Sequence, residues 1–136
     1  IATAELDMVA EINRTTDGVG AHIVFDPVGG PEVAKLTQVM APQGMFFQYG
    51  ALDSRDMLVP VFNILGKHLT LRGYELFEIT TDSEKMARAK SFITEGLRAG
   101  KLKPVIDKTF PFEEIADAQR YMEANGQVGK IVVTVE

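Results

Sequence analysis

Apolar positions along the chain change between helical spacing and short continuous runs. The helical spacing that follows Asp7 predicts a first helix, with Asp7 as its N-terminal cap. The run Ala21–Asp26 places apolar side chains on both faces, which is typical of an interior parallel strand covered by helices. An apolar stripe from Pro31 to about Ala41 predicts a second helix, and Met45–Tyr49 predicts a second buried strand.

The remainder of the chain continues this alternation with longer polar stretches between the elements. Pro42-Gln43-Gly44 indicates a turn, and residues 51–60 are polar and irregular. Thr81 and Glu84 form a capping box that opens a helix closed by Gly100. The other predicted elements are a short helix at about 61–67, an edge-like strand at 69–75, a strand at 104–107, a helix at about 113–124 and a final strand at 130–135.

The order of these elements predicts the fold class and two regions. Helix and strand alternate three times at the start, which favours an α/β fold with a parallel sheet and right-handed crossovers. After Gly100 the order changes to strand, helix, strand. We therefore expect one region at residues 1–78 and another at residues 79–136, with the boundary near Leu76–Thr81.

Composition narrows the class of protein. The 136 residues carry a net charge of -5 and form no basic stripe, so we do not expect nucleic acid as a partner. The chain has no cysteine, which excludes disulfides and thiolate-bound zinc within it. No apolar run approaches the roughly 20 residues of a membrane span, so no membrane partner is expected. Because the chain begins with Ile1 rather than Met, we expect it to start within a longer protein, with loss of the initiator by processing as the alternative.

Three glycine-containing segments are candidates for a ligand site. Gly18-Val19-Gly20 precedes a strand, whereas a dinucleotide-binding fingerprint follows one, so a turn is the favoured interpretation. Asp26–Pro31 does lie between a strand and a helix and could bring backbone N–H groups to a ligand, although a tight turn is the favoured alternative. Tyr49-Gly50-Ala51 follows a buried strand, where it forms either part of a ligand site or an aromatic cap on the sheet.

No group of side chains has the spacing of a metal site or a catalytic triad. His22 and His68 are far apart, and neither has a second ligand at helical spacing. Glu113 and Glu114 match the dipole at a helix N-terminus better than an acid–base pair. From its residues alone, the chain is an α/β protein with a candidate ligand edge.

Several segments in the same order resemble the medium-chain dehydrogenase/reductase superfamily, in its quinone oxidoreductase-like branch. Residues 18–30 resemble the fourth strand of that family's nucleotide-binding domain with its turn, residues 41–50 the fifth strand, and residues 69–74 the sixth. Residues 100–133 match the family's C-terminal return. The resemblance implies the C-terminal half of a Rossmann-type parallel sheet, plus a returning segment of the catalytic domain.

The resemblance also implies what precedes this chain. In the family, the pyrophosphate-binding glycine loop, the residue that separates NAD from NADP and most of the catalytic domain come earlier, and Ile1 would end the third strand. In the strand order 3-2-1-4-5-6, Ala21–Asp26 pairs with the first strand. Without that partner its apolar edge is open, and such edges promote aggregation. We therefore expect this edge to pair with another copy or to belong to a longer protein.

A cofactor site follows from the same resemblance. The nicotinamide of NAD or NADP would lie across the carboxyl ends of the strands and exchange hydride with the substrate. Residues after the fourth strand pass near the cofactor, those after the fifth run beside the nicotinamide ribose and carboxamide, those of the sixth line the cleft, and the C-terminal segment approaches the cofactor or substrate. No catalytic residue or metal ligand is assigned within this chain. The implied cofactor-binding residues are Pro27, Val28, Gly29, Tyr49, Gly50, Ala51, Gly73, Tyr74 and Lys130.

The expected function is NAD(P)H-dependent hydride transfer to a small quinone, enone or carbonyl substrate by the whole protein, with the isolated chain inactive. One alternative is a zinc-dependent alcohol dehydrogenase of the same superfamily, for which upstream cysteine and histidine ligands would be the sign. Another is a non-enzymatic binding or assembly module. We also expect a cytoplasmic protein and a homodimer formed through the edge strand at residues 69–74.

Overall fold

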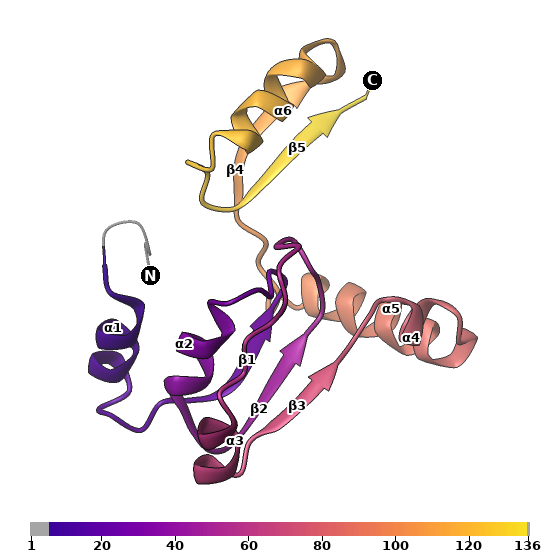
Figure 1. Cartoon of the computed structure of the whole chain (residues 1–136). Coiled ribbons are helices and arrows are strands. Elements are labelled where there is room, and N and C mark those ends of the chain that lie inside the picture. Colours follow the sequence, from indigo (N-terminus) through magenta and orange to yellow (C-terminus); the bar gives the residue numbers. More distant parts are fainter. Residues whose placement is uncertain (1–5, 136) are drawn as a thin grey trace. The chain divides into compact units, whose positions relative to one another are not determined.

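The computed structural model of this chain describes residues 6–135, so the expectation for Ile1 lies outside the described residues. The chain divides into two compact units that meet between Thr81 and Asp82 (Figure 1). We call them the first unit and the second unit, and each is described by itself.

The first unit contains a parallel sheet of three strands in the order β1-β2-β3. Because all three strands run in the same direction, their carboxyl ends lie at one edge of the sheet. This confirms the predicted α/β class with a parallel sheet. The elements are α1 (Met8–Thr15), β1 (Ala21–Asp26), α2 (Val33–Gln38), β2 (Met40–Gln48), α3 (Val61–Lys67), β3 (Thr70–Gly73) and α4 (Phe77–Thr80).

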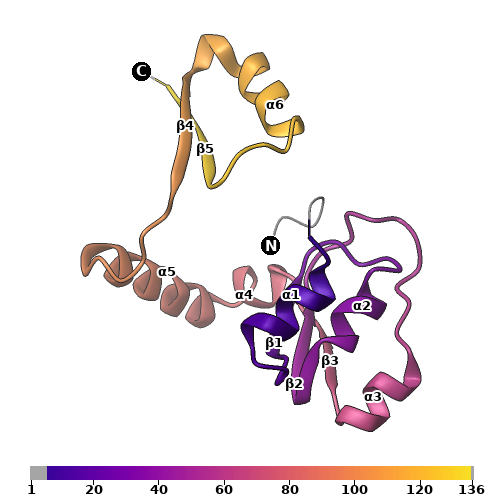
Figure 2. The ribbon, with the colours of Figure 1, turned by 90° about the vertical axis from the view of Figure 1, so that its left-hand side faces the viewer.

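The core of the first unit lies between the sheet and two helices. Helices α2 and α3 lie on one side of the sheet (Figure 2). Phe46 of the central strand is fully buried, and Val33, Met40 and Leu69 complete the buried cluster. Burial of these apolar side chains fixes which face of each strand points toward the helices.

The opposite face of the sheet is largely uncovered among the described residues. Ile23 and Phe25 are 59% and 65% exposed. Phe25 stacks on Phe47 with 5.0 Å between ring centroids, and the Arg72 guanidinium lies 6.0 Å from the Phe47 ring. The prediction that both faces of Ala21–Asp26 are buried is therefore wrong within this structure, because α2 and α3 cover one face only.

The join between α2 and β2 differs from the sequence-based expectation. The helix ends at Gln38, and the predicted turn Pro42-Gln43-Gly44 lies inside β2. Ala21 pairs with Met40, but the next pair along the ladder joins Ile23 to Met45. The extra residues form a bulge, in which Gln43 adopts a positive φ of 61°. Pairing with β1 thus brings Pro42, Gln43 and Gly44 into a strand, although their local sequence predicts a turn.

The sequence located the start of α1 and the following turn correctly. The Asp7 carboxylate accepts a hydrogen bond of 2.8 Å from the Ala10 N–H, which confirms it as the cap. Gly18 and Gly20 both have positive φ, and a Cβ at Gly20 would lie 2.6 Å from the Val39 carbonyl oxygen. The Gly18–Gly20 segment is therefore a turn that presses against the backbone before β2.

The second unit pairs two parallel strands beside a helix. Its strands β4 and β5 form a two-stranded sheet. The predicted capping box is wrong, because the Asp82 carboxylate caps α5 while the Thr81 hydroxyl donates to the Phe77 carbonyl. The strand expected at 104–107 begins two residues later. The elements are α5 (Ser83–Arg98), β4 (Ile106–Pro111), the 3-10 turn η1 (Phe112–Glu114), α6 (Ile115–Glu123) and β5 (Lys130–Thr134).

The helices within residues 6–135 are short relative to the thickness of a lipid bilayer. None of them is long and apolar enough to cross a membrane.

Candidate functional site

Three of the four predicted cofactor segments come together at the carboxyl ends of β1, β2 and β3. Pro27-Val28-Gly29 follows β1, Tyr49-Gly50-Ala51 follows β2, and Gly73-Tyr74 ends β3. The Tyr49 N–H donates to the Asp26 carbonyl at 3.0 Å, and the Tyr74 N–H donates to the Gln48 carbonyl at 2.9 Å. We call residues 27–29, 49–51 and 73–74 the carboxyl edge. The fourth segment, Lys130, begins β5 in the second unit.

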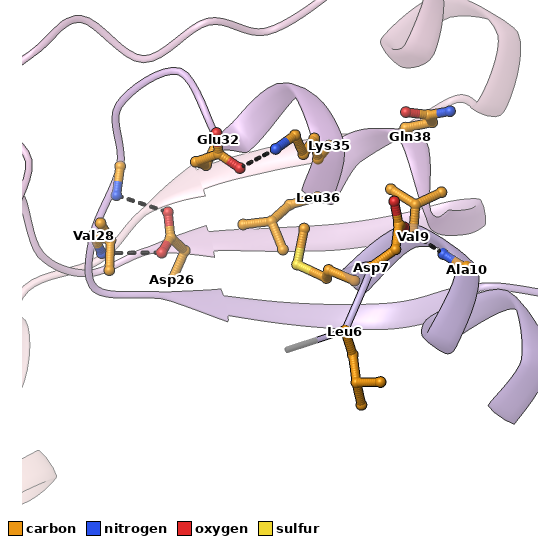
Figure 3. A pocket seen from close by; sticks show the side chains of 12 residues that line it. Leu6, Asp7, Val9, Ala10, Asp26, Val28, Glu32, Lys35, Leu36 and Gln38 are labelled. Atoms are coloured by element: carbon orange, nitrogen blue, oxygen red, sulfur yellow. Dashed lines mark hydrogen bonds and ion pairs between the residues drawn. The ribbon is translucent and has the colours of Figure 1, made fainter. Parts of the chain in front are cut away.

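A buried aspartate organises the loop after β1. Asp26 is 5% exposed, and its two carboxylate oxygens accept hydrogen bonds from the Val28 N–H at 2.9 Å and the Gly29 N–H at 2.8 Å (Figure 3). Gly29 and Gly30 both adopt positive φ, which is why glycine suits these positions. The loop therefore has the geometry of a tight turn held by Asp26.

The loop after β1 is also tied to the segment after β2. The Leu52 N–H donates to the Pro27 carbonyl at 3.2 Å, and the Asp53 N–H donates to the Val28 carbonyl at 3.0 Å. A Cβ at Gly50 would lie 2.5 Å from the same Pro27 oxygen. The two segments therefore pack backbone against backbone, and Gly50 is the residue that permits this approach.

These bonds limit what the loop can offer to a cofactor. The N–H groups of Val28 and Gly29 are already used by Asp26, and Pro27 has none. The loop thus lacks the free, converging N–H groups with which a glycine loop holds phosphate. It presents instead the side chain of Val28, which is 41% exposed. The loop therefore offers apolar contact and little attraction to an anion.

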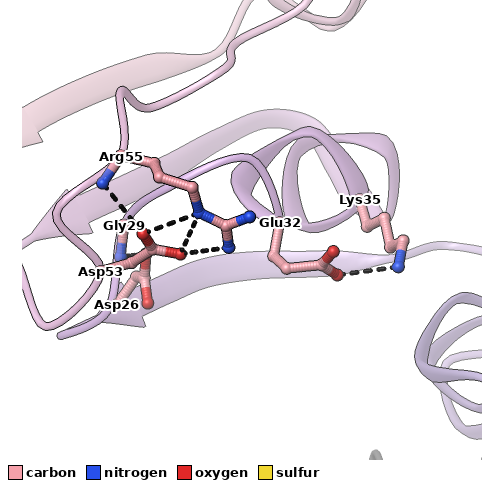
Figure 4. Close-up of polar contacts among 6 residues, drawn as sticks. All are labelled: Asp26, Gly29, Glu32, Lys35, Asp53 and Arg55. Atoms are coloured by element: carbon pink, nitrogen blue, oxygen red, sulfur yellow. Dashed lines mark hydrogen bonds and ion pairs between the residues drawn. The ribbon is translucent and has the colours of Figure 1, made fainter.

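An ion pair closes the outer side of the same loop. The Arg55 guanidinium donates to the Asp53 carboxylate at 2.6 Å, and the Arg55 N–H bonds to it at 2.9 Å (Figure 4). These hydrogen bonds lower the pKa of Asp53 to about 2. The Asp53 carboxylate would overlap a Cβ at Gly30, at 2.5 Å. Asp53 and Arg55 therefore hold the loop in place from its outer side.

A cavity of about 930 Å³ lies beside this loop, between α1 and α2. Of the nine predicted cofactor-binding residues it contains only Val28 and Gly29. A Lys35–Glu32 ion pair of 2.8 Å lies along α2, and Glu32 raises the pKa of Lys35. The cavity holds no cysteine, serine or histidine that could act as a nucleophile or base. Its lining residues are Leu6, Asp7, Met8, Val9, Ala10, Asp26, Val28, Gly29, Glu32, Lys35, Leu36 and Gln38.

Three polar residues that organise this region are absent from the nine predicted cofactor-binding residues. Asp26 and Asp53 hold the loop after β1, and Gln48 reaches Gly50 from the end of β2 with a bond of 2.6 Å. The sequence signal for Gln48 was a single polar residue within an otherwise apolar strand. Residues 6–135 contain no group of three or more His, Cys, Asp or Glu side chains that could hold a metal ion.

The sequence matches the zinc-binding dehydrogenase family over residues 2–133. A zebrafish (Danio rerio) relative, the synaptic vesicle membrane protein VAT-1 homolog, is 27% identical over 96% of this chain and 30% of its own length. The 2-haloacrylate reductase of a Burkholderia species is 26% identical over 93% of this chain and 39% of its own length. The chain therefore spans only 30% to 39% of the length of these curated relatives.

Solved structures agree with this match. A crystal structure of an NAD-dependent alcohol dehydrogenase aligns with 96% of this chain and 36% of its own, at a TM-score of 0.75 and 27% identity. A mycobacterial protein complexed with NADPH aligns with 93% of this chain and 40% of its own, at a TM-score of 0.75. Its identity of 19% shows the shared fold alone. The predicted resemblance and the Rossmann-type fold are both confirmed.

Proposed function

The chain belongs to the zinc-binding dehydrogenase family, and we propose that it is part of an NAD(P)H-dependent oxidoreductase that reduces a small quinone, enone or carbonyl substrate. The observation that carries this proposal is the carboxyl edge, where three predicted cofactor segments meet at the ends of parallel strands. Ligands of open α/β sheets bind outside the carboxyl ends of the strands. The nicotinamide, when bound, supplies the hydride.

The exposed side chains and the open backbone of the carboxyl edge indicate how this chain would contact the cofactor. The Val28 and Tyr49 side chains, 41% and 46% exposed, offer apolar contact to a planar ring and exclude water from its face. Gly73 leaves open space around its Cα, so a ligand can approach this backbone closely. Pyrophosphate binding and the choice between NAD and NADP belong to other parts of the whole protein. Pro27, Gly29, Gly50, Ala51, Tyr74 and Lys130 complete the proposed cofactor residues.

A charged substitution at an exposed position tests this assignment. We expect Val28→Glu to weaken NADPH and NADH binding to the whole protein about 10-fold or more, because it places a carboxylate where the ring would pack. Val19→Glu is the matched control, since Val19 is 54% exposed in the turn before β1. Affinity is read from nucleotide fluorescence, and thermal unfolding of both variants reports on the fold.

Each outcome of that titration has a clear meaning. Loss of affinity in Val28→Glu alone would support the carboxyl edge as the cofactor site. Equal affinity in both variants would remove the carboxyl edge from the proposal, and no binding of either nucleotide by the unaltered protein would refute the oxidoreductase function. The isolated chain should bind at millimolar concentration at best, since the loop after β1 uses its amides internally.

The family name and the alcohol dehydrogenase alignment support a zinc-dependent enzyme as the second candidate. The chain has no cysteine, so any cysteine ligand of the zinc would have to lie elsewhere in the whole protein. Elemental analysis of the purified whole protein separates the candidates: stoichiometric zinc that is needed for activity favours the alcohol dehydrogenase, and full activity after chelation favours the zinc-free reductase.

We further propose a cytoplasmic homodimer in which β3 pairs with β3 of a second copy. As an edge strand of the sheet, β3 leaves the backbone groups of one side available for pairing. The same argument applies to β1, whose exposed Ile23 and Phe25 make its edge a place for pairing with another copy or with the rest of a longer protein. Light scattering that finds only a monomer of the whole protein would refute the dimer.

A further inference from the structure

The carboxamide of Gln48 lies where the three segments of the carboxyl edge meet. Gln48 is the last residue of β2, and the strand register places it opposite Asp26 of β1 and Gly73 of β3. Its Nε2 donates to the Gly50 carbonyl at 2.6 Å, and a Cβ at Gly29 would lie 3.3 Å from the same nitrogen. This side chain thus bonds to the segment after β2 and lies close to the loop after β1.

The bond to Gly50 determines the orientation of one peptide group. The Gly50 carbonyl and the Ala51 N–H belong to the same planar trans peptide, so they point in opposite directions. Because the Gly50 carbonyl points at the Gln48 amide nitrogen, the Ala51 N–H points away from that side chain. Ala51 is exposed, and its N–H has no hydrogen-bond partner among the described residues.

We propose that Gln48 is a positioning residue that holds the Ala51 N–H as a donor to the carboxamide oxygen of the nicotinamide. The inference rests on the proposed function and concerns the nicotinamide end of the same site. A carbonyl oxygen is the natural partner of a free, outward backbone N–H, and a neutral donor matches a neutral acceptor.

The second atom of the Gln48 carboxamide argues against a purely structural role. Its Oε1 is buried and has no hydrogen-bond partner among residues 6–135. A buried acceptor without a partner destabilises the fold, and a methionine of similar length would avoid this. The amide cannot be reversed to relieve the cost, because its oxygen would then face the Gly50 carbonyl. The polar group is therefore better explained by its hold on Gly50 than by packing.

Replacing Gln48 with methionine distinguishes an effect on cofactor positioning from an effect on folding. We expect Gln48→Met, in the whole protein, to unfold at the same or a higher temperature and to bind NADP⁺ about 10-fold more weakly by calorimetry, the effect of losing one oriented hydrogen bond. Thionicotinamide NADP⁺, whose sulfur is a weak acceptor, should lose little affinity from the same change. Gln119→Met on α6 is the matched control, because Gln119 is an exposed glutamine of the second unit.

A glutamate substitution adds a pH-dependent readout. In Gln48→Glu the ionised carboxylate faces the Gly50 carbonyl, with the Asp26 carboxylate opposite it on β1, Tyr74 after β3 and Asp53 in the neighbouring loop. The Asp26 carboxylate and the burial of this position disfavour the charged form, whereas the charge of Asp53 is offset by its ion pair with Arg55. The protonated form can again donate to Gly50, so the affinity for NADP⁺ should recover as pH falls, relative to the unaltered protein at the same pH.

These results can be distinguished from failure of the proposed function. If the unaltered protein binds NADP⁺ and Gln48→Met binds it equally well, the positioning role is wrong while the cofactor site stands. An equal loss with NADP⁺ and its thionicotinamide analogue would overturn the carboxamide oxygen as the acceptor. If the unaltered protein binds no nicotinamide nucleotide, both proposals fall together.

Discussion

Asp26 provides the most direct test of how the loop after β1 is built. Its carboxylate accepts two backbone hydrogen bonds, of 2.9 and 2.8 Å, while only 5% of the residue is exposed. A hydrogen bond to a charged group contributes about 1.5–3 kcal/mol. Asp26→Asn keeps one acceptor and turns an NH₂ group toward the other N–H, so we expect a loss of about 2 kcal/mol. Asp26→Ala removes both acceptors, so we expect about 4 kcal/mol.

The assay must report on the first unit by itself, since the chain has two units that need not unfold together. The chain has no tryptophan and three tyrosines. Tyr49 and Tyr74 lie in the first unit, so tyrosine fluorescence in a Tyr121→Phe background follows that unit alone. For a unit of this size each kcal/mol lowers the melting temperature by about 4–8 °C. We therefore expect a decrease of roughly 10 °C for the asparagine variant and about twice that for alanine.

The control substitution is Asp56→Ala, which removes an exposed carboxylate from the neighbouring loop. It should change the melting temperature by less than about 3 °C, because surface substitutions usually stay within ±0.5 kcal/mol. If Asp26→Ala melts at the same temperature as Asp56→Ala, the two hydrogen bonds do not hold the loop. The structural account of the loop after β1, on which the carboxyl edge depends, would then be wrong.

Three further predictions concern backbone fit and two ionisable pairs. Gly20→Ala should destabilise the first unit by at least about 2 kcal/mol more than Gly18→Ala, since both have positive φ but only Gly20 presses on the Val39 carbonyl; equal melting temperatures would contradict this. The Asp53 carboxyl has a pKa of about 2, below its usual 3.8, so its pairing with Arg55 is present above pH 3.8 and lost as pH falls toward 2. In Arg55→Met the NMR titration midpoint of Asp53 should rise toward 3.8, and an unchanged midpoint would show that Arg55 is not the cause. The hydrogen bond to Asp107 raises the pKa of Tyr121, so Asp107→Asn should lower the midpoint of its alkaline absorbance titration, and an unchanged midpoint would exclude that bond.

The strands were more predictable than the joints between them. Ala21–Asp26 was identified at both ends, because a short apolar run between glycines and a proline leaves few alternatives. The bulge in β2 was not, because Pro42-Gln43-Gly44 has the local signature of a turn and becomes part of a strand only through pairing with β1. Register between strands depends on residues about 20 positions apart, which a local pattern does not contain.

The start of α5 shows a different limit. Thr81 and Asp82 are both good capping residues, and the sequence favours Thr81 because Glu84 completes a capping box. In the structure Asp82 has the extended backbone of a cap, with φ of -110°, whereas Thr81 continues the short helix α4 that the sequence did not predict. An unexpected helix therefore displaced the cap by one residue.

For the candidate site, the positions of the segments were predictable, but the orientations of their backbone groups were not. The resemblance supplied the segments that follow each strand, and parallel pairing brings three of them to one edge. It could not supply the direction in which their N–H groups point. That direction depends on Asp26 and Gln48, whose partners lie two or three residues along the chain and follow from the turn geometry.

The orientation of the backbone groups gives the loop after β1 and the segment after β2 different binding properties. After β1 the amides turn inward to a carboxylate, so this loop can offer shape and apolar contact but little attraction to an anion. After β2 the Gly50 carbonyl is bonded to the Gln48 amide, which directs the Ala51 N–H away from that side chain. A cofactor that carries both a neutral carboxamide and a charged pyrophosphate would therefore be held by this chain at its nicotinamide end. Under the proposed function, the pyrophosphate charge would be matched in a part of the whole protein outside this chain, which spans 30% and 39% of its two curated relatives.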